Sequence, residues 1–309
     1  MENTANVSLN PSNDFTLDAK KEQKKSQIAS TVSKVFTYIF LTIVAITSFL
    51  PFYWMVMSSL KTEGEFRQSV PTFFPTEGIQ WDNYSFVVQY TNANGASFSS
   101  YLVNTLIVGI LSTGFGVIVT IISAYAFARL EFKGKNLLFT IMLATMMIPG
   151  ELFTITNYQT VFNLGWMNSF TVLIIPFLVS IFYIYLLRQN FMQIPNELYL
   201  AAKVDGTSDL KYLWKVMIPL ALPTLISITI LKMMGSWNTY VWPKLVANDD
   251  IHSLVTNGLR NAFTVQDTGE TNYPVQMAAV AIVSAPLFMV FIFLRKYIMK
   301  GVSRSGIKG

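Results

Sequence analysis

Six long apolar runs decide what this chain of 309 residues can fold into. They cover roughly residues 35–57, 102–127, 137–160, 170–188, 218–242 and 274–295. Each is long enough to cross about 30 Å of hydrocarbon as a helix, which takes about 20 residues. None shows the alternation of polar and apolar residues that marks the strands of a membrane barrel. The sequence therefore predicts an all-α polytopic membrane protein with six transmembrane helices in one domain, residues 35–309.

Composition agrees with this prediction and sets the N-terminal segment apart. The chain is 52% hydrophobic and only 13% charged, which is too apolar for a soluble domain of this size. Residues 1–34 are instead rich in Asn, Ser, Lys and Asp, and we expect them to form a mobile tail. The first apolar run is longer than the core of a signal peptide and lacks the small residues of a cleavage site after it, so we expect it to remain as a membrane anchor.

The net charge of +5 is explained by where the basic residues lie. If both termini are cytoplasmic, seventeen of them fall on the inner side, and only Lys61, Arg67, Lys244 and Arg260 fall outside. This asymmetry is the positive-inside pattern of membrane proteins. It predicts a multi-pass protein with both termini in the cytoplasm, and it leaves no basic patch for nucleic acid.

Little in the sequence supports catalysis. There is no cysteine, the only histidine is His252 in an outer loop, and the neighbouring carboxylates Asp249 and Asp250 are typical of a solvated turn. The C-terminal "GVSRSGIKG" does not form a phosphate-binding loop, because Lys308 does not directly follow Gly306 and no strand precedes it. We therefore predict a protein that is not an enzyme, with no metal and no cofactor.

A polar island at about 189–217 interrupts the apolar pattern between the fourth and fifth runs. Pro195 suits the first turn of a short helix, and Gly206 can end that helix with a positive φ. Thr207 or Ser208 can cap a second helix, with Asp209 in its first turn. Helical spacing groups Leu198 with Ala201 and Ala202 on one face of the first helix. It groups a larger apolar set on one face of the second: Leu210, Leu213, Trp214, Met217 and Ile218.

The island resembles the signature loop of permease subunits of binding-protein-dependent ABC importers. That pattern is Glu-Ala-Ala, three residues, Gly, nine residues, Ile, one residue, Leu-Pro. This sequence supplies Ala201, Ala202, Asp205, Gly206, Val216, Ile218 and Pro219 at the corresponding places. Leu200 stands where the family has glutamate, so a salt bridge from that glutamate has no counterpart here. Without the resemblance, the island would simply lie along the membrane surface or pack on its own bundle.

Other segments resemble the carbohydrate branch of the same family, of the maltose type. They include "AYAFARLEFKGK" at 124–135, "MMIPGELF" at 146–153 and "SWNTYVWPKL" at 236–245, and the resemblance covers residues 35–309. It implies an ABC importer type I permease fold in a bacterial or archaeal cell membrane. It also implies import of a sugar, in particular an oligosaccharide, with a phosphorylated polyol as the alternative.

The resemblance further implies the partners. They are a second homologous permease in a heterodimer, a cytoplasmic ABC ATPase dimer that hydrolyses the ATP, and an extracytoplasmic solute-binding protein. The short helix would sit in a groove of the ATPase. The predicted ATPase-coupling residues are Pro195, Leu200, Ala201, Ala202, Asp205, Gly206, Val216, Ile218 and Pro219.

Two ionisable residues lie within apolar runs, where each needs a cavity or a partner. Glu151 follows Pro149 and Gly150, which we expect to break the third helix, and Lys232 lies within the fifth run. Counting about 1.5 Å per residue puts both roughly 21 Å above the cytoplasmic ends of their helices. They can therefore form an ion pair or line a transport cavity. As a charged relay they would suit an ion-gradient transporter, although no inverted repeat is evident.

Aromatic and amide side chains complete the predicted substrate pathway. An indole with an adjacent amide, as in Trp237 and Asn238, is suited to a sugar ring and its hydroxyls. Tyr240 and Asn157 are candidates of the same kind, whereas Trp242 fits an aromatic belt at the membrane interface. The predicted pathway residues are Glu151, Asn157, Lys232, Trp237, Asn238 and Tyr240.

Overall fold

The computed structural model describes residues 11–92, 95–261, 263 and 271–303. Within these ranges the regular structure is helical, and the only extended pairing is an isolated bridge between Thr91 and Ser97. The predicted all-α class is confirmed. The helices are α1 (Pro11–Ser59), α2 (Glu63–Phe66), α3 (Asp82–Gln89), α4 (Phe98–Arg129), α5 (Lys135–Thr145), α6 (Thr154–Asn163), α7 (Phe170–Ile174), α8 (Ile181–Met192), α9 (Asn196–Val204), α10 (Asp209–Tyr212), α11 (Ile218–Trp237), α12 (Val241–Val246), α13 (Val255–Asn261) and α14 (Tyr273–Ser303).

The chain divides into two compact units, Met1–Met57 and Ser58–Gly309. The first unit consists of most of α1. Residues 11–34, predicted from composition to be a mobile tail, form the first part of this helix, and residues 1–10 lie outside the described part. The stretch 18–27 is made of Ala, Lys, Glu, Gln, Asp and Ser, most of which are strong helix formers, so its polarity does not prevent a helix from continuing into the apolar run.

Four of the six predicted spans are single long helices: Ile28–Ser59, Phe98–Arg129, Asp209–Trp237 and Tyr273–Arg295. The other two are bent pairs, so the count reaches six only if each pair is one span. Lys135–Thr145 and Gly150–Asn163 meet at 85°, and Phe170–Phe177 meets Ile181–Met192 at 42°. The predicted break at Pro149 and Gly150 is confirmed. The fifth span ends earlier than predicted, at Trp237 instead of residue 242.

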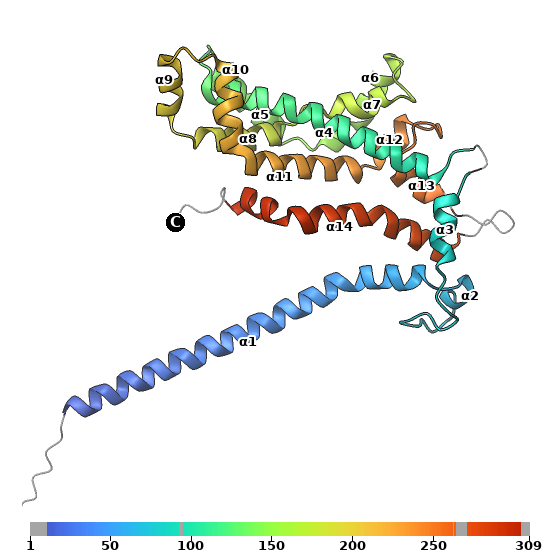
Figure 1. Cartoon of the computed structure of the whole chain (residues 1–309), viewed down its shortest axis with the longest axis horizontal. Coiled ribbons are helices and arrows are strands. Elements are labelled where there is room, and N and C mark those ends of the chain that lie inside the picture. The colour runs from blue at the N-terminus through green and yellow to red at the C-terminus, as the bar shows by residue number, and fades with distance from the viewer. Residues whose placement is uncertain (1–10, 93–94, 262, 264–270, 304–309) are drawn as a thin grey trace, which may run out of the picture. The chain divides into compact units, whose positions relative to one another are not determined.

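The second unit is built around α4 and α11. α4 packs against α8 and α11, and α11 packs against α14 on its other side, as Figure 1 shows. Small residues on one face of α4 allow the close contact with α11. A Cβ added at Gly109 would lie 2.8 Å from Met233 Cε, and Ser112 Oγ is 3.2 Å from Ser236 Oγ. Such small residues are typical of helix contacts in membranes, where backbones approach closely.

The segment between α1 and α3 folds around a buried carboxylate. Glu65 in α2 is 1% exposed and accepts hydrogen bonds from Thr72 Oγ1 at 2.6 Å, Thr76 N at 2.9 Å and Glu77 N at 3.3 Å. Burial acts to raise the pKa of Glu65, but these hydrogen bonds outweigh it and the pKa lies below its ordinary value. The carboxylate therefore stays charged and fixes the loop that follows α2.

We expect Gly258→Ala to destabilise the protein by about 1–3 kcal/mol, because the added methyl group overpacks a rigid contact. A Cβ at Gly258 in α13 would overlap the ring of Tyr101, which is buried and hydrogen-bonded to Asn92 at 3.0 Å. Gly114→Ala in α4 is the matched control, since nothing lies within 4 Å of its added Cβ. The thermal midpoint of the purified protein measures both, and equal midpoints would contradict the contact.

Candidate functional site

The polar island folds largely as its local signals indicate. α9 runs from Asn196 to Val204, with Pro195 at the N-cap just before the predicted first turn. Gly206 has a φ of +70°, which favours glycine. Ser208 caps the next helix by accepting from Lys211 N at 3.4 Å, and Asp209 lies in its first turn. In Figure 1, α9 and α10 lie at the opposite end of the bundle from α12 and α13.

The second short helix is not a separate element. A π-helical segment, Leu213–Met217, joins α10 to α11, so that Asp209–Trp237 is continuous. The wider turn changes the spacing of side chains. Leu213 and Met217 are buried, whereas Leu210 is 67% and Trp214 61% exposed. The prediction that these residues share one apolar face was therefore wrong.

Asp209 ties three elements together. Its carboxylate accepts hydrogen bonds from Tyr125 Oη of α4 at 2.9 Å and Tyr199 Oη of α9 at 3.0 Å. It also forms a salt bridge with Lys203 Nζ of α9 at 2.9 Å. The hydrogen bond to Asp209 raises the pKa of Lys203 above its ordinary value. The sequence indicated Asp209 only as a favourable residue in the first turn of a helix, so its bonds to α4 and α9 were not predicted.

Two arginines join α4 to α8 and to the segment that precedes α9. Arg129 at the end of α4 donates to the backbone oxygens of Phe191 and Ile194, which lie just before α9. Arg188 Nε of α8 donates to Phe127 O at 3.0 Å. These bonds satisfy carbonyl groups near the ends of α4 and α8, where helices leave them without intrahelical partners. The start of α9 is thus fixed to α4 by Arg129, although Leu200 stands where the family pattern has a glutamate.

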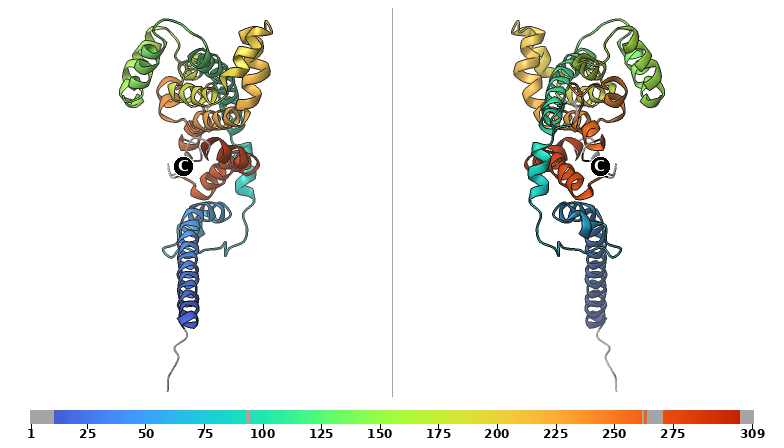
Figure 2. Two further views of the ribbon diagram at one scale, coloured as in Figure 1. Left: turned by 90° about the vertical axis from the view of Figure 1, so that its left-hand side faces the viewer. Right: turned by 90° about the vertical axis from the view of Figure 1, so that its right-hand side faces the viewer.

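The outward face of α9 carries apolar residues together with the exposed Glu197, and it differs from the predicted face. Tyr199 and Ala202 pack against the core cluster formed by α4, α8 and α11. Leu200 and Val204 point outward, with 55% and 89% exposure, and Ala201 is also exposed. Figure 2 shows this part of the chain (yellow) at the edge of the bundle. The face available to a partner therefore comprises Glu197, Leu200, Ala201 and Val204, and Ala202 belongs to the inner face.

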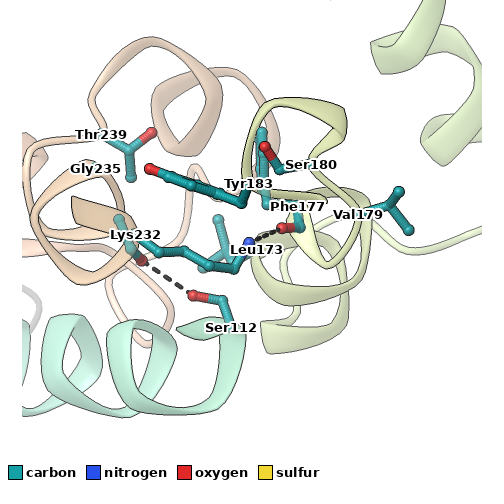
Figure 3. A pocket seen from close by; sticks show the side chains of 10 residues that line it. Ser112, Leu173, Phe177, Val179, Ser180, Tyr183, Lys232, Gly235 and Thr239 are labelled. Carbon is teal, nitrogen blue, oxygen red and sulfur yellow. Dashed lines mark hydrogen bonds between the residues drawn. The ribbon is translucent and has the colours of Figure 1, made fainter. Parts of the chain in front are cut away.

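A cavity of about 350 Å³ lies between α4, α11 and the broken fourth span. Figure 3 shows its lining, with the Lys232 side chain directed into it. The ten lining residues are Ser112, Leu173, Phe177, Val179, Ser180, Tyr183, Lys232, Gly235, Ser236 and Thr239. Only Lys232 was predicted. The hydroxyl residues were missed because single Ser and Thr residues are frequent in apolar runs.

Lys232 is held by contacts from two sides. Its ammonium donates to Phe177 O at 2.7 Å, at the point where the fourth span breaks, and lies 5.7 Å from the centre of the Tyr183 ring. Its side chain crosses α4 directly over Gly116, where an added Cβ would be 2.6 Å from Nζ. Gly116 thus makes room for the lysine.

A second cavity of about 680 Å³ holds other predicted residues. Glu151, Asn157 and Tyr240 line it together with Trp242. The two cavities share Phe177 and Thr239 in their linings. The predicted ion pair was wrong, because no salt bridge joins Glu151 to Lys232 in the described part of the chain. Depth was counted along straight helices, whereas the third span turns by 85° before Glu151.

Trp237 and Asn238 line neither cavity. Trp237 is 3% exposed in a core cluster with Phe98 and Val275, so both ring faces are covered. Asn238 Nδ2 donates to Met234 O at 2.9 Å and caps its own helix. Trp242 is also buried, and its Nε1 donates to Val172 O at 3.0 Å, so the predicted position in an interface belt was wrong.

The outer loop with His252 is tied to the bundle. His252 Nδ1 lies 2.6 Å from Asp249 Oδ2, and Asp250 accepts from Asn92 Nδ2 at 2.9 Å. The carboxylates therefore do not form the freely solvated turn that was predicted. No cluster of three or more metal-ligating side chains occurs among the residues that the structure describes.

Comparisons with known proteins agree with the fold, and the family match includes the polar island at about 189–217. The family model for "Binding-protein-dependent transport system inner membrane component" matches residues 116–304, more than half of the chain. The arabinooligosaccharides transport system permease protein AraQ of Bacillus subtilis is 25% identical, over 90% of this chain and 97% of its own. The sn-glycerol-3-phosphate transport system permease protein UgpE of Yersinia pestis is 26% identical, over 87% and 95%.

One solved structure supports the architecture. A chain of a bacterial ABC transporter involved in the import of the acidic polysaccharide alginate superposes with a TM-score of 0.76 at 23% identity. The match covers 87% of this chain and 97% of that one. This likeness concerns the fold, which is that of an ABC importer permease.

We expect Asp209→Asn to loosen α9, because it removes the salt bridge to Lys203 and weakens the two tyrosine bonds. Hydrogen exchange of the backbone amides of α9 should quicken by about tenfold, the equivalent of about 1.4 kcal/mol. Asp205→Asn is the matched control, since no side-chain hydrogen bond or salt bridge of Asp205 is found among the described residues. Unchanged exchange in Asp209→Asn would contradict the link.

Proposed function

The chain belongs to the family of binding-protein-dependent transport system inner membrane components, and we propose that it is the permease subunit of an ABC importer that moves a sugar into the cytoplasm. The observation that carries this proposal is α9, a short helix bonded to Asp209 with Leu200, Ala201 and Val204 on its exposed face. The free energy for transport would come from a partner, because the sequence holds no phosphate-binding loop.

The proposed contact with the partner ATPase is through α9. Leu200, Ala201 and Val204 form a small exposed apolar surface, with Glu197 on the same face of α9 and Lys203 elsewhere on the helix. An apolar helix face of this kind fits a groove in a partner, and the charges beside it steer association. Gly206 and Ser208 set the angle at which α9 leaves the bundle. A movement of the ATPase would thereby be passed to the permease.

The remaining partners follow from the same proposal. Both termini lie in the cytoplasm, as the distribution of basic residues predicts, which puts α9 on the side of the ATPase dimer. A second homologous permease completes the heterodimer in the bilayer. An extracytoplasmic solute-binding protein delivers the sugar to the opposite face.

The proposed substrate is an oligosaccharide, and the alternative is a phosphorylated polyol. Similar proteins are described for arabinooligosaccharides and for sn-glycerol 3-phosphate. The two cavities, about 350 and 680 Å³, have the size of small-molecule sites. Their mixture of aromatic, amide and hydroxyl side chains suits a sugar.

An ion-gradient transporter is the competing function. It would use Glu151 and Lys232 as a relay, but these residues line separate cavities. The test is solute uptake by the complete transporter in vesicles. Under the proposal, uptake stops when the partner ATPase is inactivated by mutation and continues when the ion gradient is collapsed by an ionophore. The reverse pattern would establish the competing function.

We expect Gly206→Val to abolish uptake while the protein remains in the membrane. A β-branched side chain is strained at a φ of +70°, so the turn after α9 must change. Gly206→Asn is the matched control, because asparagine tolerates this conformation better and should keep most of the uptake. If Val and Asn variants transport equally well, the turn is not part of the coupling.

Ala201→Trp should reduce recovery of the ATPase with the permease by about tenfold or more, since added volume is not tolerated in a filled groove. Ala202→Trp provides a contrast on the same helix. Ala202 packs inward, so this variant should lower the thermal midpoint of the permease itself. Full recovery of the ATPase with Ala201→Trp would exclude the outer face of α9 as the contact.

A further inference from the structure

The ammonium group of Lys232 lacks an anionic partner. The residue is 8% exposed, and no acidic side chain lies within salt-bridge distance among the described residues. Within the described part of the chain, the ammonium donates one hydrogen bond, at 2.7 Å, to the backbone oxygen of Phe177. An ammonium has three N–H donors, so donors remain for a further acceptor. A charge within a membrane span is costly, and such residues mostly face a cavity or a polar partner. Lys232 lies on one wall of the 350 Å³ cavity.

The other polar groups of this cavity are hydroxyls. Ser112 Oγ and Ser236 Oγ lie 3.2 Å apart beside the lysine, and Ser180 and Thr239 line the same space. In Figure 3, Ser112 lies near the lysine side chain, and Ser180 and Thr239 lie on the other side of the Tyr183 ring. None of the ten lining residues is acidic. The cavity therefore combines one positive charge with several neutral hydrogen-bonding groups, an arrangement that favours an anion over a neutral solute.

The contact between α4 and α11 fixes the position of the Lys232 side chain. Its side chain lies over Gly116, and any larger residue there would collide with it. The ring of Tyr183 flanks the ammonium at 5.7 Å. The lysine is thus held in place before a ligand arrives, which reduces the entropy lost on binding.

The neighbouring cavity has the opposite charge. Glu151 lines it, and the two cavities share Phe177 and Thr239. A carboxylate repels an anionic group, so such a group would be directed away from Glu151 and toward Lys232. A neutral sugar would gain nothing from this separation of charge.

We propose that the Lys232 cavity binds a carboxylate or phosphate group of the transported solute. The transporter would then select an acidic sugar or a sugar phosphate over a neutral sugar of the same size. This inference rests on the proposed transport function, and it names the substrate class. The competing explanation is that Lys232 only holds the broken fourth span through its bond to Phe177 O.

The test measures binding to the purified complete transporter by calorimetry, without ATP and without the solute-binding protein. One pair of probes is digalacturonate and its methyl ester, and the other is glycerol 3-phosphate and glycerol. Each pair differs in the anionic group, so the two pairs distinguish a carboxylate from a phosphate. We expect at least one anionic probe to bind about tenfold or more tightly than its neutral counterpart, as for a charge-assisted hydrogen bond.

Three variants assign this preference to the lysine. Lys232→Met should abolish it by weakening only the anionic probe, and Lys232→Arg should retain it. Lys244→Met is the matched control, because Lys244 is exposed on α12 and outside both cavity linings, and it should leave the preference unchanged. If Lys232→Met does not fold, Gly116→Ala displaces the ammonium without removing it and should reduce the preference in the same way.

Two results would overturn the proposal. One is equal binding of the charged and neutral probes by the wild-type protein. The other is a loss in Lys232→Met that is equal for both probes of a pair, which is the result of a purely structural lysine. Because no ATP is present, a failure of the ATPase-driven function would appear in the uptake experiment and would leave these binding ratios unaffected.

Discussion

The close contact between α4 and α11 is the interaction on which the second unit depends. Lipid tails are as apolar as leucine, so helices in a membrane are held together by close packing and by hydrogen bonds between them. Gly109 and Gly116 remove side chains from the α4 face, and Ser112 bonds to Ser236 across the contact. α8 and α14 then pack on this pair. Lys232 can cross to the fourth span only because Gly116 leaves space for it.

The second constraint is that broken helices must satisfy their backbone groups inside the protein. The fourth span breaks after Phe177, and the Phe177 carbonyl accepts a hydrogen bond from the ammonium group of Lys232. Near the same break, Val172 O accepts from the indole of Trp242. Polar side chains of α11 and α12 therefore satisfy two backbone carbonyls of the broken fourth span. The cavities lie where these irregular segments meet the straight helices.

Local signals predicted local structure well. The apolar runs located the spans, Pro149 and Gly150 marked the break, and the signals at Gly206 and Ser208 located the end of α9 and the following cap. The predictions that failed are those that depend on tertiary packing. A straight-helix count could not show that Glu151 turns away from Lys232. The sequence around Trp237 could not show that Phe98 and Val275 cover its ring. The π segment that rotates Trp214 outward has no local signature that was recognised.

One continuous helix connects the two candidate sites. Asp209 holds α9 to the start of α10, which passes through Leu213–Met217 into α11, and α11 carries Lys232. The opposite wall of the cavity comes from the fourth span, whose end at α8 is fixed to α4 by Arg188. A pull on α9 would therefore act first on the wall that bears Lys232. The hydrogen bond from Lys232 to Phe177 O joins the two walls. A bound anion would accept hydrogen bonds from the same ammonium group, so its binding would act on the contact between the walls.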